Sequence, residues 1–167
     1  MDKFLCVMAG FNDQTEKTLN ILQDKLYSKG FVGNQTKDIP THITIGTLAC
    51  EKESELVDFL KEITLSTKPI EVEFHHIGIF WGGEVLFVAP DINGYMLELK
   101  ELFGSSKGWT PHVTMLIDDT NTVLEAERIL LSEFKEFIGE IDKIYLYEFF
   151  PPRYIGCYIL KWLQMNN

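Results

Sequence analysis

The stretch PTHITIG, residues 40–46, and the stretch PHVTMLI, residues 111–117, are built on one pattern. In both, a proline precedes a histidine by one or two residues, and a threonine follows two positions after the histidine. Polar and apolar side chains alternate, which is typical of a strand with one buried face. Proline is tolerated at a strand start, because its missing N–H does not interrupt the ladder there. Each stretch therefore predicts a strand that presents His-x-Thr on one face.

The segments around these two strands follow one order. In each half, a strand and a helix precede the His-x-Thr strand, and a helix and a strand follow it. The predicted elements are a strand at 4–8, a helix from Asp13 to a stop at Gly30, strand 41–46, helix 53–63, strand 70–80, strand 84–89, helix 90–103, strand 112–117, helix 122–138, and strands 143–149 and 157–162. One βαβαβ plan is thus used twice. We predict an α+β fold in a single bilobal domain over residues 1–167, with lobe halves near 1–80 and 81–167 that can exchange strands.

The two His-x-Thr strands suggest a chemistry. Side chains at i and i+2 of a strand share a face, so His42 lies beside Thr44, and His112 beside Thr114. If the halves pack about a pseudo-two-fold axis, the pairs meet across a groove. One neutral imidazole can then take a proton from an attacking hydroxyl or water, while the other, protonated, gives one to the departing oxygen. The threonine hydroxyls can donate to the non-bridging phosphate oxygens. The scheme needs no metal and no cofactor.

Composition limits the partners. The formal net charge of −10 argues against a large footprint on long nucleic acid, because such binding needs a basic stripe. No run of about 20 apolar residues is present for a membrane helix, and the N-terminus does not resemble a signal peptide. The three cysteines, Cys6, Cys50 and Cys157, are far apart and are interpreted as reduced core residues. We expect a monomeric, cytoplasmic protein that does not contact membranes.

The paired motifs resemble those of the two-histidine (2H) phosphoesterase superfamily, in the group that includes bacterial 2′-5′ RNA ligases and 2′,3′-cyclic nucleotide phosphodiesterases. The segment 72–90 is similar to the strand pair between the family's two motifs, and the segment 144–162 is similar to its closing strands. The resemblance implies a bilobal fold with two mainly antiparallel sheets facing a central groove and helices outside. It implies opening of 2′,3′-cyclic phosphates, or cutting of 2′-linked phosphodiesters, in nucleotides or short RNA. It also implies that His42 donates and His112 accepts the proton, roles that reaction direction can exchange.

The chain departs from this family pattern at one place. Members of the ligase group often carry a serine in the strand after the second motif's helix, just past a stretch like Leu-Tyr-Glu. Here that place corresponds to Phe149 or Phe150. Together with the acidic composition, this departure weakens the 2′-5′ RNA ligase alternative and favours a small substrate.

Two further residues, Arg153 and Tyr154, are candidates for substrate binding, whereas structural or surface roles are expected for His75 and His76. Arg153 and Tyr154 follow the turn at residues 151–152, and they could hold a phosphate and stack on a base, although a plain turn is equally compatible with them. His75 and His76 are adjacent, so on a regular strand one would face inward and the other outward. With no further ligands at suitable spacing, the sequence predicts no metal site there.

Three functions remain open on sequence. The first is a metal-independent phosphodiesterase. The second is a nucleotide-binding module on the same scaffold that has no activity. The third is an interaction domain in which His42 and His112 are incidental. A single His-x-Thr is common by chance, but two of them at equivalent places in the two halves are not. The matched pair therefore favours the enzyme.

Overall fold

The computed structural model describes residues 2–163. The predicted order of elements is confirmed: each half contributes a strand, a helix, a His-x-Thr strand, a helix and a strand, and a final strand closes the chain. The elements are β1 (Phe4–Phe11), α1 (Asp13–Tyr27), β2 (His42–Ala49), the 3₁₀ turn η1 (Cys50–Lys52), α2 (Glu53–Thr64), β3 (Ile70–Ile79), β4 (Val85–Pro90), α3 (Gly94–Glu101), β5 (Val113–Ile117), α4 (Thr120–Glu133), β6 (Phe137–Phe149) and β7 (Arg153–Ile159). No helix in residues 2–163 is long and apolar enough to cross a membrane.

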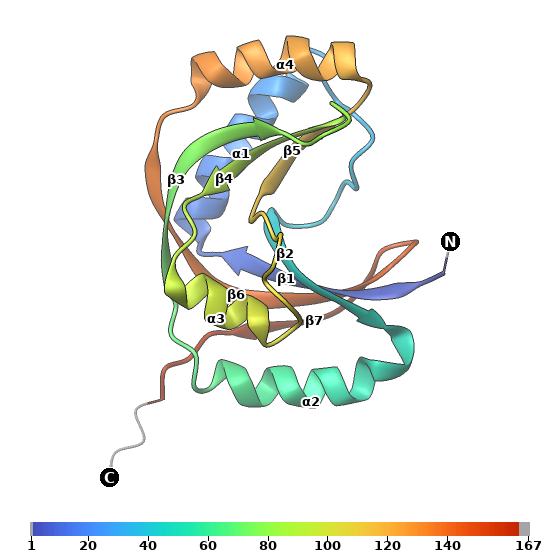
Figure 1. Cartoon of the computed structure of the whole chain (residues 1–167), viewed down its shortest axis with the longest axis vertical. Coiled ribbons are helices and arrows are strands. Elements are labelled where there is room, and N and C mark those ends of the chain that lie inside the picture. Colours follow the sequence, from blue (N-terminus) through green and yellow to red (C-terminus); the bar gives the residue numbers. More distant parts are fainter. Residues whose placement is uncertain (1, 164–167) are drawn as a thin grey trace.

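All seven strands belong to one antiparallel sheet, whose main path runs β2-β1-β6-β3-β4-β5. The order is the same from both ends: an edge strand with His-x-Thr, the strand that precedes it in sequence, and then a central strand. β3 pairs with residues 137–141 of β6 at the centre, and β7 pairs with residues 143–148 of β6, on the side away from β1. The two sheets implied by the family resemblance are thus the two halves of one bent sheet. Figure 1 shows the bend, which turns the edge strands β2 and β5 toward each other.

The helices cover the outer faces of the bent sheet. α1 and α4 lie against each other over one half, whereas α2 packs near β7 at the other end (Figure 1). Their inward faces carry leucine and other apolar side chains at helical spacing, each of which stabilises the fold by roughly 1.5–3 kcal/mol when fully buried. The buried helical residues include Leu19, Leu22, Leu26, Leu56, Leu60, Val123, Ala126 and Leu130. The helices thereby fill the core from outside and leave the inner face of the bend for the site.

Two predicted helix boundaries are wrong. The helix predicted to reach Ile138 ends at Glu133, because Phe134 adopts an extended conformation and Phe137 begins β6. Phe137 stacks on Phe74 of β3 with ring centroids 4.6 Å apart, a cross-strand contact that a continued helix would lose. The helix predicted from residue 90 begins instead at Gly94. The Asn93 side chain caps it by accepting a hydrogen bond from the Met96 N–H at 3.0 Å.

Candidate active site

Both His-x-Thr stretches form strands as predicted, except that His112 lies directly before β5 and not in it, and both strands are at the edges of the sheet. Ile43 and Val113, between histidine and threonine, are buried in the core, so the polar side chains must face the other way. Each edge strand also carries a bulge at the residue after the threonine, Ile45 in β2 and Met115 in β5, which has no partner in the register. A bulge increases local twist and bends the strand. The two halves therefore bend their motif strands at equivalent positions.

The edges of the bent sheet are held close together by hydrogen bonds. Cα atoms of β2 and β5 approach within 8 Å. The indole Nε1–H of Trp109, just before β5, donates to the backbone oxygen of Thr44 at 3.1 Å. The loop before β2 in turn contacts β5, where the Gln35 side-chain oxygen accepts from the Ile117 N–H at 3.0 Å. These contacts tie each motif strand to the other half of the molecule.

A cavity of about 340 Å³ opens between the two edges. His42, Thr44 and Thr114 line it, and Val113, the neighbour of His112, borders it as well. The remaining lining residues are Phe4, Cys6, Gln23, Gln35, Thr36, Ile39, Pro40, Thr41, Thr47, Ile117, Phe149 and Phe150. The structure thus brings three of the four predicted motif side chains to one cavity, with His112 next to it.

The two imidazole rings are held in the same way. Nδ1 of His42 lies 2.8 Å from the backbone oxygen of Pro40, and Nδ1 of His112 lies 2.8 Å from that of Thr110. A carbonyl oxygen can only accept, so in both rings Nδ1 carries the hydrogen. The tautomer and ring orientation are therefore set by the residue two positions earlier in the chain. On both rings Nε2 is left to exchange a proton with a ligand.

Burial lowers the pKa of both histidines. Desolvation lowers the pKa of His42 most, the hydrogen bond to the Pro40 carbonyl opposes the shift, and the positive charge of His112 lowers it further. Desolvation likewise lowers the pKa of His112, opposed by the Thr110 carbonyl. A doubly protonated pair is therefore disfavoured.

Aromatic side chains surround His112. The ring of Phe80 meets it edge-on with centroids 4.7 Å apart, and the ring of Phe87 lies at 5.4 Å. Such rings exclude water from one side of the imidazole, consistent with the desolvation that lowers its pKa. Sequence reasoning missed both phenylalanines as site residues. The only available signal was their position on the strand pair between the two motifs.

A second aromatic group borders the cavity on the side of β2. Phe4 stacks on Phe149 with centroids 5.9 Å apart, and Phe150 lies 4.9 Å from Phe149. All three line the cavity. The place at which the chain departs from the ligase-group serine pattern therefore lies at the candidate site. The cavity lining within residues 2–163 contains no Lys, Arg, Asp or Glu side chain.

Arg153 and Tyr154 are not brought to this cavity. The Arg153 guanidinium donates to Glu53 at 2.6 Å and to Glu148 at 3.2 Å, so its charge is already paired. Tyr154 is mostly exposed on β7 and packs edge-on against Tyr147 with centroids 5.5 Å apart. Neither residue is among those that line the cavity. Their predicted contact with substrate stays a prediction.

The orientation expected for His75 and His76 is wrong. β3 carries a bulge at His75, because Phe74 pairs with Pro90 and His76 with Ala89. A bulge places two residues opposite one partner, so strict alternation fails there. As a result both histidines are exposed, and neither points into the core.

Comparison with known proteins supports the fold strongly and the sequence relationship weakly. No protein-family model matches the chain, and no curated protein sequence matches it. Among solved structures, apo E. coli LigT superposes with a TM-score of 0.65 at 13% identity, over 95% of this chain and 98% of that one. A structure titled phosphoesterase gives 0.60 at 12% identity over 95% and 99%. TT0787 of Thermus thermophilus gives 0.61 at 13% over 95% and 98%.

These likenesses bear on the architecture. The antiparallel α+β fold of E. coli LigT, which is consistent with the fold that the motif resemblance implied, is the fold of this chain. E. coli LigT has also been crystallised with 3′-AMP, with NADP⁺ and with ATP, and each of those structures resembles this one over nearly its whole length.

Proposed function

We propose that this chain is a metal-independent phosphodiesterase that opens 2′,3′-cyclic phosphates, or cuts 2′-linked phosphodiesters, of nucleotides or short RNA. The observation that carries the proposal is the matched pair of imidazoles. Each has Nδ1 engaged by a backbone carbonyl at 2.8 Å, and each leaves Nε2 for proton exchange. His42 and His112 supply the two proton transfers, and Thr44 and Thr114 supply hydroxyl donors. The shared fold with LigT and a phosphoesterase supports the same chemistry.

Hydrolysis of a cyclic phosphate on this pair proceeds as follows. The neutral imidazole takes a proton from a water molecule through Nε2 as the water oxygen bonds to phosphorus. The P–O bond on the opposite side breaks, and the imidazolium gives its Nε2 proton to the departing ribose oxygen. The product is a phosphomonoester with a free hydroxyl. The two histidines have then exchanged protonation states, and proton exchange with solvent restores the original states.

The threonine hydroxyls act on the phosphate itself. Negative charge builds on the non-bridging oxygens as water attacks, and fixed donors in a desolvated site stabilise that charge. Thr44 and Thr114 line the cavity from opposite edges of the sheet, so they can reach different oxygens. No Asp or Glu of residues 2–163 lines the cavity, so no carboxylate there competes with the phosphate for the threonine hydroxyls.

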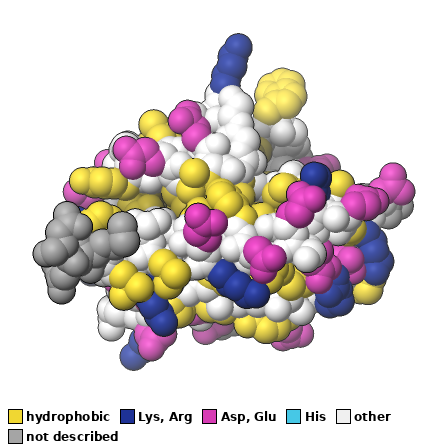
Figure 2. All heavy atoms as spheres, turned by 90° about the horizontal axis from the view of Figure 1, so that it is seen from below, with side chains coloured by type: hydrophobic (Ala, Val, Ile, Leu, Met, Phe, Trp, Pro, Cys, Tyr) yellow, Lys and Arg dark blue, Asp and Glu magenta, His cyan; other side chains and the backbone are white. Residues whose placement is uncertain are grey.

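The cavity favours a substrate with one phosphate. Its lining contains no Lys or Arg among residues 2–163, so a second phosphate would find no cation there. Phe4, Phe149 and Phe150 offer apolar rings, and a nucleobase stacks on such rings with roughly 1–3 kcal/mol. On the face seen in Figure 2, Lys and Arg are interspersed with Asp and Glu and form no continuous stripe. A nucleoside 2′,3′-cyclic phosphate fits these features better than a long RNA.

A panel assay tests the proposal. Nucleoside 2′,3′-cyclic phosphates, a 2′,5′-linked dinucleotide and a short RNA with a cyclic phosphate end are incubated with the protein in EDTA, and the products are separated by chromatography. We expect turnover of the cyclic mononucleotides to a single phosphomonoester, undiminished by the chelator. Saturable binding without turnover would instead identify a module that only binds nucleotides. Activity that appears only with added Mg²⁺ contradicts the two-histidine mechanism.

The pH dependence of this activity follows from the burial of the rings. Because desolvation lowers both histidine pKa values below about 6.5, the singly protonated pair is most populated on the acid side of that value. We expect kcat/KM to follow a bell whose maximum lies below about pH 6.5 and to fall as pH rises through neutrality, because the acid loses its proton. The limbs belong to the coupled pair. A flat profile from about pH 5 to about pH 8 is incompatible with the proposal.

A further inference from the structure

A group of imidazole and carboxylate side chains gathers on the exposed side of β3, away from the candidate active site. The bulge at His75 turns both His75 and His76 to this side. Glu73, two residues before His75, shares the same face. The backbone N–H of Asp91, just after β4, donates to the Glu73 backbone oxygen at 2.8 Å and so fixes Asp91 beside them. Glu136 joins from the segment before β6.

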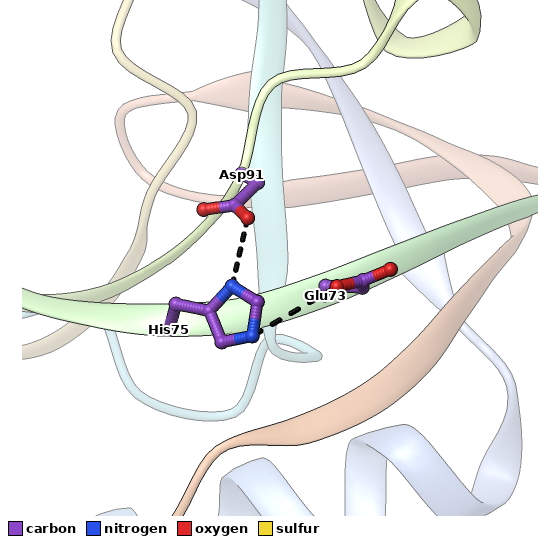
Figure 3. A group of neighbouring side chains, drawn as sticks. All are labelled: Glu73, His75 and Asp91. Carbon is purple, nitrogen blue, oxygen red and sulfur yellow. Dashed lines mark hydrogen bonds and ion pairs between the residues drawn. The ribbon is translucent and has the colours of Figure 1, made fainter.

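The Asp91 carboxylate sets the orientation of both imidazoles. One of its oxygens lies 2.7 Å from Nδ1 of His75, and the other lies 2.7 Å from Nε2 of His76. Figure 3 shows the His75 ring between Asp91 on the Nδ1 side and Glu73 on the Nε2 side. With Nδ1 bound to a carboxylate, Nε2 is the ring atom available to a cation.

The surroundings of His75 Nε2 resemble a cation site. It lies 3.8 Å from a Glu73 carboxylate oxygen and 3.3 Å from one of Glu136. Around a tetrahedral zinc ion with bonds of about 2.0–2.2 Å, neighbouring ligand atoms lie about 3.4 Å apart. Ligand atoms of Glu73, His75 and Asp91 lie within 4.8 Å of one another, a group that does not include Glu136, so Glu136 must move toward Glu73 for the two to share an ion. All four side chains are at least partly exposed, so they are free to rotate toward a shared ion.

We propose that this group is a binding site for a divalent transition-metal ion, of which Zn²⁺ is the probe. His75 Nε2, Glu73 and Glu136 hold the ion, and water completes its coordination. Asp91 accepts the Nδ1–H of His75, the arrangement by which carboxylates orient metal-bound histidines. The mixed nitrogen and oxygen donors suit zinc and its neighbours better than Ca²⁺ or Mg²⁺. The ion would link β3 to the start of β6, at the joint between the two halves of the sheet.

This site is separate from the two-histidine pair. Glu73 and Asp91 border a larger cavity of about 860 Å³, which shares no lining residue with the cavity at His42. The ion therefore plays no part in the proposed proton transfers. The two proposals can fail independently, because one concerns turnover in EDTA and the other concerns metal binding without substrate.

Zinc titration by calorimetry, with anomalous scattering to locate the ion, tests the site. We expect one Zn²⁺ to bind the wild-type chain. Removing the ligand should weaken binding by at least about 10–100-fold in His75→Ala, and Asp91→Asn should weaken it by about 10–100-fold through loss of the orienting carboxylate. Glu71→Gln is the matched control, because Glu71 is exposed on the same face of β3 but is not among the side chains that contact His75. It should bind zinc within about 2-fold of wild type.

Two further measurements separate this site from other zinc ligands in the chain. A His42→Ala/His112→Ala double variant should still bind one Zn²⁺, and zinc should raise the Tm of wild type but not of His75→Ala. If His75→Ala binds zinc as tightly as wild type, or if wild type binds none at a hundred micromolar or so, the assignment is overturned. Circular dichroism of each variant confirms that it is folded.

Discussion

Replacing either His42 or His112 by alanine is expected to lower kcat/KM for a nucleoside 2′,3′-cyclic phosphate by about 10²–10⁴-fold, the usual contribution of one positioned proton transfer. Each ring has Nδ1 fixed by a backbone carbonyl, and alanine removes the Nε2 that would exchange the proton. Initial rates over a range of substrate concentrations measure the loss. KM should change less than kcat, because the apolar cavity wall stays in place.

The double variant separates a shared mechanism from two independent contributions. If the rings act as one acid–base pair, the His42→Ala/His112→Ala variant should be little worse than the poorer single variant, since residues that act as a unit are strongly non-additive. His76→Ala is the matched control, because that histidine is exposed, bonds to Asp91 and does not line the cavity at His42. It should keep wild-type activity. Wild-type rates in both motif variants would leave the histidines as incidental strand residues.

Replacing Phe74 by alanine should give the largest loss of stability among single substitutions at the sheet centre. Phe74 is fully buried, stacks on Phe137 at 4.6 Å and contacts the ring of Phe11 at 5.8 Å. Truncating a buried phenylalanine removes transfer free energy and leaves a cavity, together about 3–5 kcal/mol. Urea unfolding followed by circular dichroism measures the change.

Phe74 lies where the two halves of the sheet join. Phe74 and Phe137 are register partners in β3 and β6, the strands that join the two halves of the sheet. Ile138→Ala is the control, because Ile138 is 68% exposed in the same part of β6, and it should cost within about 0.5 kcal/mol. A loss of less than about 1 kcal/mol in Phe74→Ala would mean that the centre of the sheet is not closely packed.

The matched bulges explain how an ordinary sheet makes this site. Ile45 and Met115 interrupt the ladders at equivalent places, one residue beyond each threonine. Each bulge bends an edge strand, and the bent edges approach each other across the cavity. Because edge strands have one unpaired side, their ends are free to turn without loss of ladder hydrogen bonds. The two bulges thus bring the two edge strands together around one groove.

The order of elements and the faces of the motif strands were determined by local sequence. Alternation around His42 and His112 sets which side chains enter the core, and this depends only on the two-residue period of a strand. The matching order of the two halves could likewise be predicted, because helices and strands of these lengths have distinct periods. The end of α4 could not be predicted, since Phe137 joins β6 through a contact with Phe74, distant in sequence.

The composition of the site was decided by tertiary structure. Phe4, Phe80 and Phe150 come from three separate segments, and no local pattern marks them as neighbours of the histidines. Local sequence also could not predict the face of β3 on which His75 lies. A bulge depends on how two strands pair, and not on the period of one strand. The period of a helix or strand determines the face on which each side chain lies, whereas strand pairing and the bend of the sheet determine which residues lie close together.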